Sequence, residues 1–434
     1  MSLSPISRFN AAILAVTSCA VLALPAFAGS QARIVRLSDV QGSVQVDKNS
    51  GLGFENAFLN LPITQGTQLR TGVDGRAEVE FEDGSTLRIA PKTTIHFSAL
   101  GLSDAGQHLS EVNLAQGMMY INWLGKGGDT FNLNFSHEKI SLDHYAHLRV
   151  DTSASAVKLA VFKGDVNVEG PSGTVTVAKN KTVTFDVGNG DKSKVANHIE
   201  EAALDSWDRE SISYHDQYAK NTPASPYAYG LSDLNYYGAY SNVPGYGMMW
   251  QPYFAGVGWD PFVDGAWGFY PGYGYMFASA YPWGWLPYRY GNWNFIPGSG
   301  WMWQPGGWNG WLAVPHYTPT TLAHATSLVA PSTGTKTVVV GRAVTRSTVM
   351  PERISVNAGS AGLGIPRGFV DNLHHLNGQV SKNGLAEVYA PGRTTMSAPE
   401  WYGHGTSSRT ATAVSGTSHA SSGSHSSSGG TAHR

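Results

Sequence analysis

Cysteine is almost absent from the sequence: its 434 residues include only Cys19, which lies inside an N-terminal apolar run over residues 11–28. The run closes with Ala26-Phe27-Ala28, which is typical of a secretory signal peptide with a small-x-small cleavage site. We expect cleavage after Ala28, with lipidation at Cys19 as a minor alternative. A mature chain without cysteine excludes disulfides, thiolate metal ligands and a cysteine nucleophile.

Charge is also scarce, since Asp, Glu, Lys and Arg make up 14% of the residues and the formal net charge is -2. A chain without a basic excess lacks the usual electrostatic footprint of a nucleic-acid-binding protein. Beyond the N-terminal run, no stretch approaches the ~20 apolar residues of a membrane span. The sequence has no G-x-S-x-G, H-E-x-x-H or phosphate-loop motif, so common hydrolase and nucleotide-binding signatures are missing.

Aromatic residues and glycine are abundant, and over residues 238–311 they recur in three copies of one pattern. Each copy has a glycine, a Pro-Gly pair, a second glycine and a methionine at fixed places. The copies begin at Gly238, Gly265 and Gly291, which gives offsets of 27 and 26 residues. Self-similarity at such a period indicates a repeated supersecondary unit.

Each copy predicts a β-hairpin. Proline presets the backbone of the first central turn residue, and glycine accepts the positive φ that the second one needs. Alternating aromatic residues such as Trp301 and Trp303 place large rings on one face of a strand. One hairpin cannot bury such rings alone, so we expect the three hairpins to share an aromatic core.

Residues 33–190 predict a separate β-domain. Glu78-Val-Glu-Phe81 and Thr86-Leu-Arg-Ile89 alternate polar with apolar residues on either side of Asp83-Gly84, a strong hairpin signal. Further short strands follow at regular spacing, without a helical period between them. This pattern favours a β-sandwich or a β-roll.

The β-domain resembles the FecR family over about 150 residues. The family usually has a Gly-Thr-x-Phe element in its second half, where this chain has Tyr145-Ala-His-Leu-Arg-Val150. The resemblance rests on five segments: Gly42-Ser-Val-Gln-Val46, Leu69-Arg-Thr-Gly72, residues 77–91, Gln116-Gly-Met-Met-Tyr120 and Val161-Phe-Lys-Gly-Asp-Val166.

The best-known FecR proteins sense ferric citrate uptake from the periplasm and signal to a sigma factor through a cytoplasmic N-terminal segment. Only about ten residues precede the apolar run in this sequence. This leaves no room for a sigma-binding segment, so we expect the regulatory function of these proteins not to carry over directly. We expect the chain not to inhibit a sigma factor by itself.

A linking α-helix is predicted over residues 195–220. Its apolar stripe passes through Trp207 and Tyr214, while Asp205 and Asp208 are assigned to the solvated face. Three further regions follow: an aromatic hairpin-repeat domain over 227–317, a mostly irregular segment over 318–403, and a disordered Ser/Gly/His tail over 404–434.

The hairpin repeats resemble an uncharacterised Trp/Tyr-rich domain that is often found behind FecR domains. The resemblance is carried by a Tyr-Pro-Trp-Gly-Trp-x-Pro-Tyr run, which occupies residues 281–288 here. That family has no assigned activity. The resemblance therefore implies an architecture and no chemistry.

Two interpretations of the aromatic rings are open. The rings form the core of a domain poor in charge, which is the favoured interpretation, or some of them are exposed and stack on sugar rings. Bases are a poor alternative ligand, because no basic groove accompanies the rings. The candidate ligand-stacking residues are Trp267, Trp283, Trp285, Trp293, Trp301 and Trp303.

Candidate catalytic and metal residues are few. Asp260 and Asp264 stand beside turn-forming residues and are interpreted as turn aspartates, not as the carboxylate pair of a glycosidase. His137, His144 and His147 fall within eleven residues, but strand geometry points the last two to opposite faces. We therefore assign no catalytic residue, no cofactor and no metal.

The sequence as a whole predicts a mainly β protein exported to the periplasm or cell envelope. The first functional hypothesis is a non-enzymatic binding or scaffolding protein, with an envelope polysaccharide or an envelope protein as its partner. An alternative is a periplasmic sensor or regulator in FecR-type signalling through a membrane partner. An envelope glycan hydrolase is the third and weakest alternative.

Overall fold

The computed structural model describes residues 33–219, 228–308, 317–318 and 336–390. The expected signal peptide over residues 1–28 and the expected disordered tail over 404–434 lie outside these ranges. The fold is mainly β, with 48% strand and 12% helix, as the sequence predicts. Among the described residues, no helix is long and apolar enough to cross a membrane.

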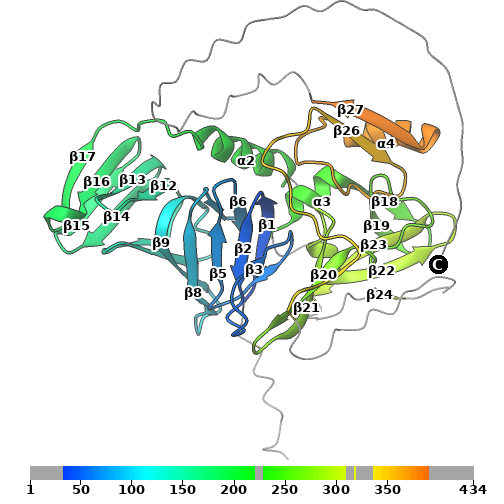
Figure 1. The fold of residues 1–434 in the computed structure, drawn as a ribbon. Helices are drawn as coiled ribbons and strands as arrows, with labels where there is room; N and C mark the ends of the chain where they lie inside the picture. The colour runs from blue at the N-terminus through cyan, green and yellow to red at the C-terminus, as the bar shows by residue number, and fades with distance from the viewer. Residues whose placement is uncertain (1–32, 220–227, 309–316, 319–335, 391–434) are drawn as a thin grey trace, which may run out of the picture. The chain divides into compact units, whose positions relative to one another are not determined.

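Two sheets that share one long strand form the β-domain (Figure 1). The shared strand is β9 (His108–Trp123), whose first half pairs in sheet B and whose second half pairs in sheet A. Sheet A has the order β4 (Pro62–Ile63), β1 (Val35–Gln41), β6 (Arg76–Glu80), β7 (Thr86–Ile89), β9, β12 (Ala146–Thr152), β13 (Ala156–Lys163), β16 (Lys181–Asp186) and β17 (Lys192–Ala196). Sheet B has the order β3 (Glu55–Asn56), β2 (Val44–Asp47), β5 (Gln68–Thr71), β8 (Thr94–Leu102), β9, β10 (Thr130–Phe135), β11 (Glu138–Leu142), β14 (Asp165–Gly170) and β15 (Gly173–Ala178).

The predicted hairpin at Asp83-Gly84 is confirmed, since β6 and β7 pair in register from Glu80 and Thr86 onward and Gly84 has a φ of 90°. The segment that departs from the FecR pattern also forms a strand. It is β12, which pairs with both β9 and β13 and buries Leu148 and Val150 in the core. Apolar side chains therefore fill the position although the motif differs.

The three predicted aromatic hairpins are present. They are β18 (Gly238–Val243) with β19 (Gly247–Pro252), β20 (Gly265–Tyr270) with β21 (Gly274–Ser279), and β22 (Tyr290–Ile296) with β23 (Gly300–Trp308). The glycine of each Pro-Gly pair, Gly245, Gly272 or Gly298, has a φ of 80° to 83°. A residue with a side chain rarely adopts this conformation, so the turn requires glycine.

The first glycine of each repeat has a different function, because an aromatic ring from the paired strand lies against it. A Cβ atom added at Gly238 would be 2.3 Å from Cζ2 of Trp250, and one added at Gly265 would be 2.1 Å from Cζ of Phe277. At Gly291 the same atom would be 2.0 Å from the carbonyl oxygen of Gln304. The repeat therefore keeps glycine where the neighbouring chain occupies the space of a side chain.

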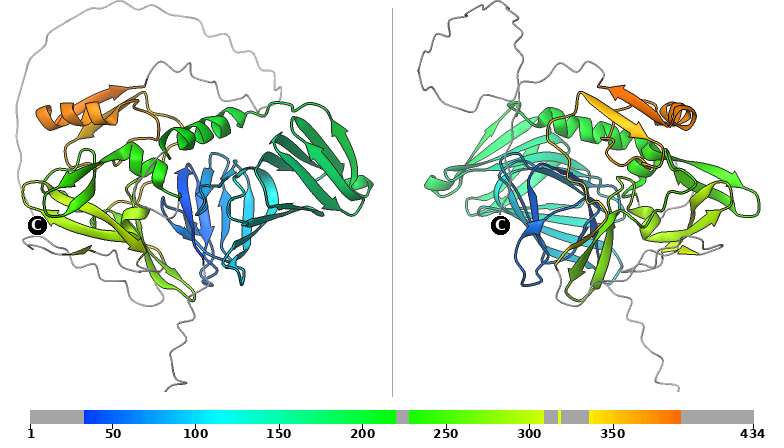
Figure 2. Two further views of the ribbon diagram at one scale, coloured as in Figure 1. Left: turned by 180° about the vertical axis from the view of Figure 1, so that it is seen from behind. Right: turned by 45° about the vertical axis from the view of Figure 1, so that its right-hand side comes forward.

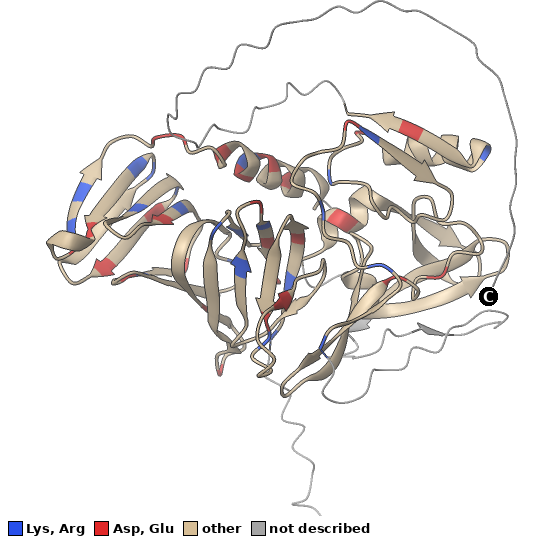
Figure 3. Cartoon of the chain, in the orientation of Figure 1, with Lys and Arg blue, Asp and Glu red and all other residues tan. Residues whose placement is uncertain are grey.

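The hairpins belong to two small sheets and share one core. β18, β19, β23 and β22 lie in one sheet with β24 (Tyr317–Thr318), and β20 and β21 lie in another with β25 (Val338–Val340). The strands of the three hairpins contain no Asp, Glu, Lys or Arg (Figure 3). Burial of aromatic rings, with edge-to-face contacts between them, is thus the main source of stability in this part.

The helix prediction over residues 195–220 is wrong at its start, because residues 192–196 pair with β16 as strand β17. The helix itself, α2 (Asp205–Tyr218), lies across the face of sheet A (Figures 1 and 2). Asp205 and Asp208, assigned above to the solvated face, are only 2% and 1% exposed. The assignment fails because sheet A presents cationic side chains to the acidic face of the helix.

Part of the segment over 318–403, which is expected to be mostly irregular, forms regular elements. β26 (Arg353–Asn357) pairs with β27 (Leu385–Tyr389), and α4 (Leu373–Asn383) packs beside them. Their apolar residues alternate and join the aromatic core through Val356 and Val380. A short helix, α3 (Leu231–Tyr237), precedes the first hairpin and is absent from the prediction.

Candidate functional site

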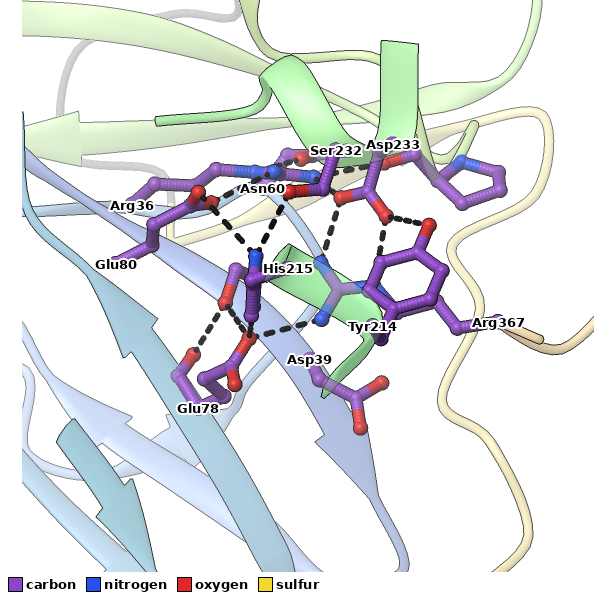
Figure 4. Close-up of polar contacts among 12 residues, drawn as sticks. Arg36, Asp39, Asn60, Glu78, Glu80, Tyr214, His215, Ser232, Asp233 and Arg367 are labelled. Atoms are coloured by element: carbon purple, nitrogen blue, oxygen red, sulfur yellow. Dashed lines mark hydrogen bonds and ion pairs between the residues drawn. The ribbon is translucent and has the colours of Figure 1, made fainter. Parts of the chain in front are cut away.

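A cluster of buried charged residues connects sheet A to the aromatic domain, and we call it the charge network (Figure 4). β1 and β6 supply the residues of sheet A, α2 and α3 supply one residue each, and the segment before α4 supplies one more. All have side chains at most 12% exposed. The members are Arg36, Glu78, Glu80, His215, Asp233 and Arg367.

Asp233 on α3 is the centre of the charge network and has no exposed surface. Arg36 of β1 contacts its Oδ2 atom through Nη2 at 2.6 Å. Arg367 binds both carboxylate oxygens, with Nε donating at 2.7 Å and Nη2 at 2.5 Å, and the hydroxyl of Tyr214 donates at 2.9 Å. Two arginines from distant parts of the sequence thus neutralise one buried carboxylate.

Glu78 and Glu80 alternate on β6, so both carboxylates point to the same face of sheet A. The Nε2 atom of His215 lies 3.0 Å from Oε1 of Glu78, and its Nδ1 atom lies 3.8 Å from Oε1 of Glu80. Arg367 also contacts Glu78 at 2.9 Å, and Arg36 contacts Glu80 at 3.0 Å. Each arginine therefore joins a glutamate of sheet A to Asp233 of α3.

The carboxylates of the charge network differ in their proton affinity. Burial alone would raise the pKa of Asp233, but the charges of Arg367 and Arg36 lower it to about 2. Burial also opposes ionisation of Glu78, yet His215 and Arg88 hold the pKa of Glu78 well below its ordinary value. At Glu80 burial prevails over the attraction of His215 and Arg36, so its pKa is raised.

A second group of buried ion pairs holds α2 on sheet A. Asp208 accepts a hydrogen bond from Nη1 of Arg88 at 2.9 Å and contacts Nε2 of His147 at 2.7 Å. Asp205 binds Arg149 at 2.5 Å and accepts a hydrogen bond from the hydroxyl of Tyr120 at 2.8 Å. The residue Arg88 also pairs with Glu78, so this group is continuous with the charge network.

Hydrogen bonds to backbone carbonyl groups strengthen the connection between sheet A and the hairpins. The side-chain amide of Asn60 donates to the carbonyl oxygens of Ser279 and Tyr281 at 2.9 and 2.8 Å, and Nη2 of Arg36 donates to the carbonyl of Pro282 at 2.7 Å. Farther along the chain, Arg346 exchanges backbone hydrogen bonds with the end of β1. These contacts add residues 279–282 and Arg346 to the segments that the charge network joins to sheet A.

The charge network is not evident from the sequence. Alternation at Glu78-Val-Glu80 predicts a strand, but nothing in one strand shows that a helix covers its polar face. One signal was available: Glu78 and Arg88 are directly opposite each other across the predicted hairpin. Their pairing with Asp208 and Arg367 joins positions up to 289 residues apart, which local pattern cannot show.

All six candidate ligand-stacking tryptophans lie in the aromatic core. The most exposed of them, Trp301, shows 5% of its surface, and Trp267, Trp283 and Trp293 show none. Trp283 stacks on Tyr281 with ring centroids 5.1 Å apart. Stacking on a sugar requires an open ring face, so this burial agrees with the core interpretation and these rings offer no binding platform.

The other residues weighed above have separate surroundings. His137, His144 and His147 each face a different aspartate, namely Asp191, Asp143 and Asp208. In the part of the chain that the structure describes, no three His, Cys, Asp or Glu side chains are grouped to hold a metal ion. Asp260 accepts a hydrogen bond from the backbone of Phe262, as a turn aspartate does, and Asp264 accepts one from the backbone of Arg342.

The aromatic core contains a buried arginine, Arg289, that is not part of the charge network. Arg289 is 4% exposed and donates to the carbonyl oxygens of Phe277 and Tyr288, at 2.9 and 3.4 Å. Its guanidinium lies 5.0 Å from the ring centroid of Trp285, and burial lowers its pKa to about 10. Unlike Arg36, it is held by carbonyl groups and an aromatic ring.

Family models match both the β-domain and the aromatic hairpins. The model described as FecR protein matches residues 67–167, which cover strands of both sheets. The chain carries a FecR domain. A second model, described as a family of unknown function (DUF6600), matches residues 231–332. We therefore call sheets A and B the FecR domain, and α3 with the three hairpins the DUF6600 domain.

Comparison with solved structures adds two crystal structures of a "putative anti-sigma factor" from Parabacteroides distasonis. One is 17% identical and covers 35% of this chain and 72% of its own, with a TM-score of 0.28. The other is 16% identical and covers 34% and 71%, also with a TM-score of 0.28. No curated protein matches the chain in sequence.

Proposed function

We propose that this chain is an exported FecR-type regulatory protein that acts by binding another protein of the cell envelope and catalyses no reaction. In this proposal the FecR domain and the DUF6600 domain respond to a partner as one unit. The observation that carries it is the charge network, in which Arg36 and Arg367 join Asp233 of the DUF6600 domain to Glu80 and Glu78 of the FecR domain.

The energetics of buried ion pairs support such coupling. Separating the domains would break the buried pairs Arg36–Asp233 and Arg367–Glu78. Removing one partner of a buried pair usually costs about 3–5 kcal/mol. A ligand that favours one arrangement of either domain would therefore change the other as well. The match to the FecR family supports regulation as the class of function.

Cross-linking in intact cells tests whether the chain binds an envelope protein. The full chain would be recovered under denaturing conditions from cells of its own species, with and without a cross-linker, and the linked proteins identified. We expect one envelope protein to be captured reproducibly, and the same protein to be captured by Glu387→Ala, whose ion pair with Arg353 is exposed.

Two outcomes would contradict the proposal. Retention of the purified chain on peptidoglycan or another envelope glycan, with no protein captured, would instead favour a scaffolding function. Release of soluble fragments from peptidoglycan by the purified chain would establish hydrolysis, and the non-enzymatic interpretation would be wrong.

A further inference from the structure

The edge strands of the two sheets of the FecR domain differ in length and in composition. β4 and β3 have only two residues each, and β4 includes Pro62 while β3 includes Glu55. β17 is longer, but Lys192 and Lys194 are exposed on it. Short length, proline and lysine are the usual means by which an edge strand avoids pairing with another chain.

β15 has none of these features. Its six residues, Gly-Thr-Val-Thr-Val-Ala, include neither a charged residue nor proline. It pairs along its whole length with β14 (Figure 1), and among the described residues no other strand pairs with it. Half of its backbone N–H and C=O groups therefore point away from the sheet and can accept a further strand.

The side chains of β15 favour an added strand as well. Val177 is buried in the core of the FecR domain, and Val175 is partly buried against the same core. Thr174 and Thr176 are exposed on the opposite face, where the hydroxyl of Thr176 donates to Oδ1 of Asn167. A paired strand would cover the exposed part of Val175 and continue the apolar row beyond the sheet edge.

We propose that β15 pairs with β15 of a second copy of this chain, in antiparallel orientation about a two-fold axis at Thr176. This register places Val175 opposite Val177 and Thr174 opposite Ala178, so valine faces valine and no charges are opposed. The same operation at β17 about Lys194 would place two lysines opposite each other. The composition of the two edges therefore selects β15 for self-association.

One six-residue strand from each copy buries less surface than a standard stable interface. We therefore expect a reversible dimer whose fraction rises with protein concentration. The inference goes beyond the proposed function and does not depend on it, since self-association is measured on the purified chain without a partner.

Thr176→Lys and Thr176→Glu test the two-fold arrangement. Each places like charges directly opposite across the axis and should raise the dimer dissociation constant about tenfold or more, while an equimolar mixture should regain dimers through Lys–Glu pairs. Sedimentation equilibrium of the full chain over a concentration series measures these constants. The matched control is Ser141→Lys on β11, since Ser141 is exposed on an inner strand and its hydroxyl donates to Asn132 as Thr176 does to Asn167; it should leave the constant unchanged.

The proposal is overturned if the wild-type chain keeps the mass of one copy throughout the series. It is also overturned if dimers form equally well in wild type and Thr176→Lys, because the interface then lies elsewhere. Capture of a different protein by a photo-cross-linking residue at Thr174 in cells, with no capture of a second copy, would assign the edge to that other partner and contradict self-pairing.

Discussion

Arg36 of β1 and Asp233 of α3 form a salt bridge of 2.6 Å in which neither side chain has any exposed surface. The first residue belongs to the FecR domain and the second to the DUF6600 domain. Burying two charges is costly unless both are fully paired, and Glu80, Asn60 and Arg367 complete the pairing. The energy of this contact therefore depends on both domains being present and docked.

Substitution of the two buried arginines by methionine should have very different effects. Arg36→Met leaves Glu80 without its arginine and leaves Asp233 with Arg367 alone. It should lower the free energy of unfolding by about 3–5 kcal/mol. Arg289→Met removes a cation that is bound by carbonyl groups and should stay within about 1 kcal/mol of wild type, because an apolar side chain suits that aromatic core. Urea unfolding of both variants measures the difference, and equal losses would show that the carboxylate partners of Arg36 contribute little.

Acid should destabilise the chain through Asp233. Its pKa in the folded state, about 2, lies below the ordinary value of about 4, so it contributes stability above pH 4 that is lost as the pH falls toward 2. The shift corresponds to roughly 2 kcal/mol. Stability measured by denaturant at several pH values should therefore fall over this window in wild type and fall less in Asp233→Asn; parallel curves would contradict this.

Glu80 should act in the opposite direction. Its folded pKa is raised, so its contribution is present below an unfolded pKa of about 4 and is lost as the pH rises through the folded value. Glu80→Gln keeps a hydrogen-bond acceptor for Arg36 but has no proton to lose, so this loss of stability should not occur in the variant. As the pH rises from 4 to neutrality, the unfolding free energy of Glu80→Gln should increase relative to that of wild type. If this difference in unfolding free energy stays constant with pH, ionisation of Glu80 does not affect stability.

Gly265→Ala should destabilise the second hairpin. The new methyl group would lie 2.1 Å from Cζ of Phe277 and 2.7 Å from the carbonyl oxygen of Ala278, so the strands must separate. Overpacking of this kind costs about 1–3 kcal/mol. Gly258→Ala is the control, because a Cβ atom there meets nothing within 4 Å. Thermal melts of the two variants should differ, and matching melts would refute the steric role of the first glycine.

Trp293→Ala should also lower the melting temperature. The ring is fully buried, and Trp259 and Trp283 pack against it with centroids 5.8 and 5.9 Å away. Truncating a buried large aromatic residue usually costs about 3–5 kcal/mol. Tyr389→Ala is a suitable control, since Tyr389 is 64% exposed. An unchanged melting temperature for Trp293→Ala would contradict its place in the core.

Local features of the fold were predictable because their cause lies within a few residues. Pro271-Gly272 determines a turn on its own, and Gly272 has the positive φ that the turn type requires. The tryptophans were predicted as a core because a segment almost without charge has few other ways to fold. The exact partner rings, such as Trp259 against Trp293, depend on loop paths that composition does not define.

The charge network could not be predicted for the opposite reason. Asp208 has the spacing of a solvated helical residue, and only the position of Arg88 on a covering sheet explains its burial. Arg367 lies 134 residues from Asp233 and 289 from Glu78, so its role emerges only from the tertiary fold. The clash at Gly265 was missed likewise, because it depends on the direction of the Phe277 ring.

The central claim, that the charge network makes the FecR and DUF6600 domains one cooperative unit, is tested most directly by following unfolding of each domain separately. Tryptophan fluorescence reports mainly on the DUF6600 domain, and hydrogen exchange in peptides from β6 and β7 reports on the FecR domain. We predict one shared urea midpoint for the two signals in wild type and two separate midpoints in Asp233→Ala. Separate midpoints in the wild-type chain would contradict the claim.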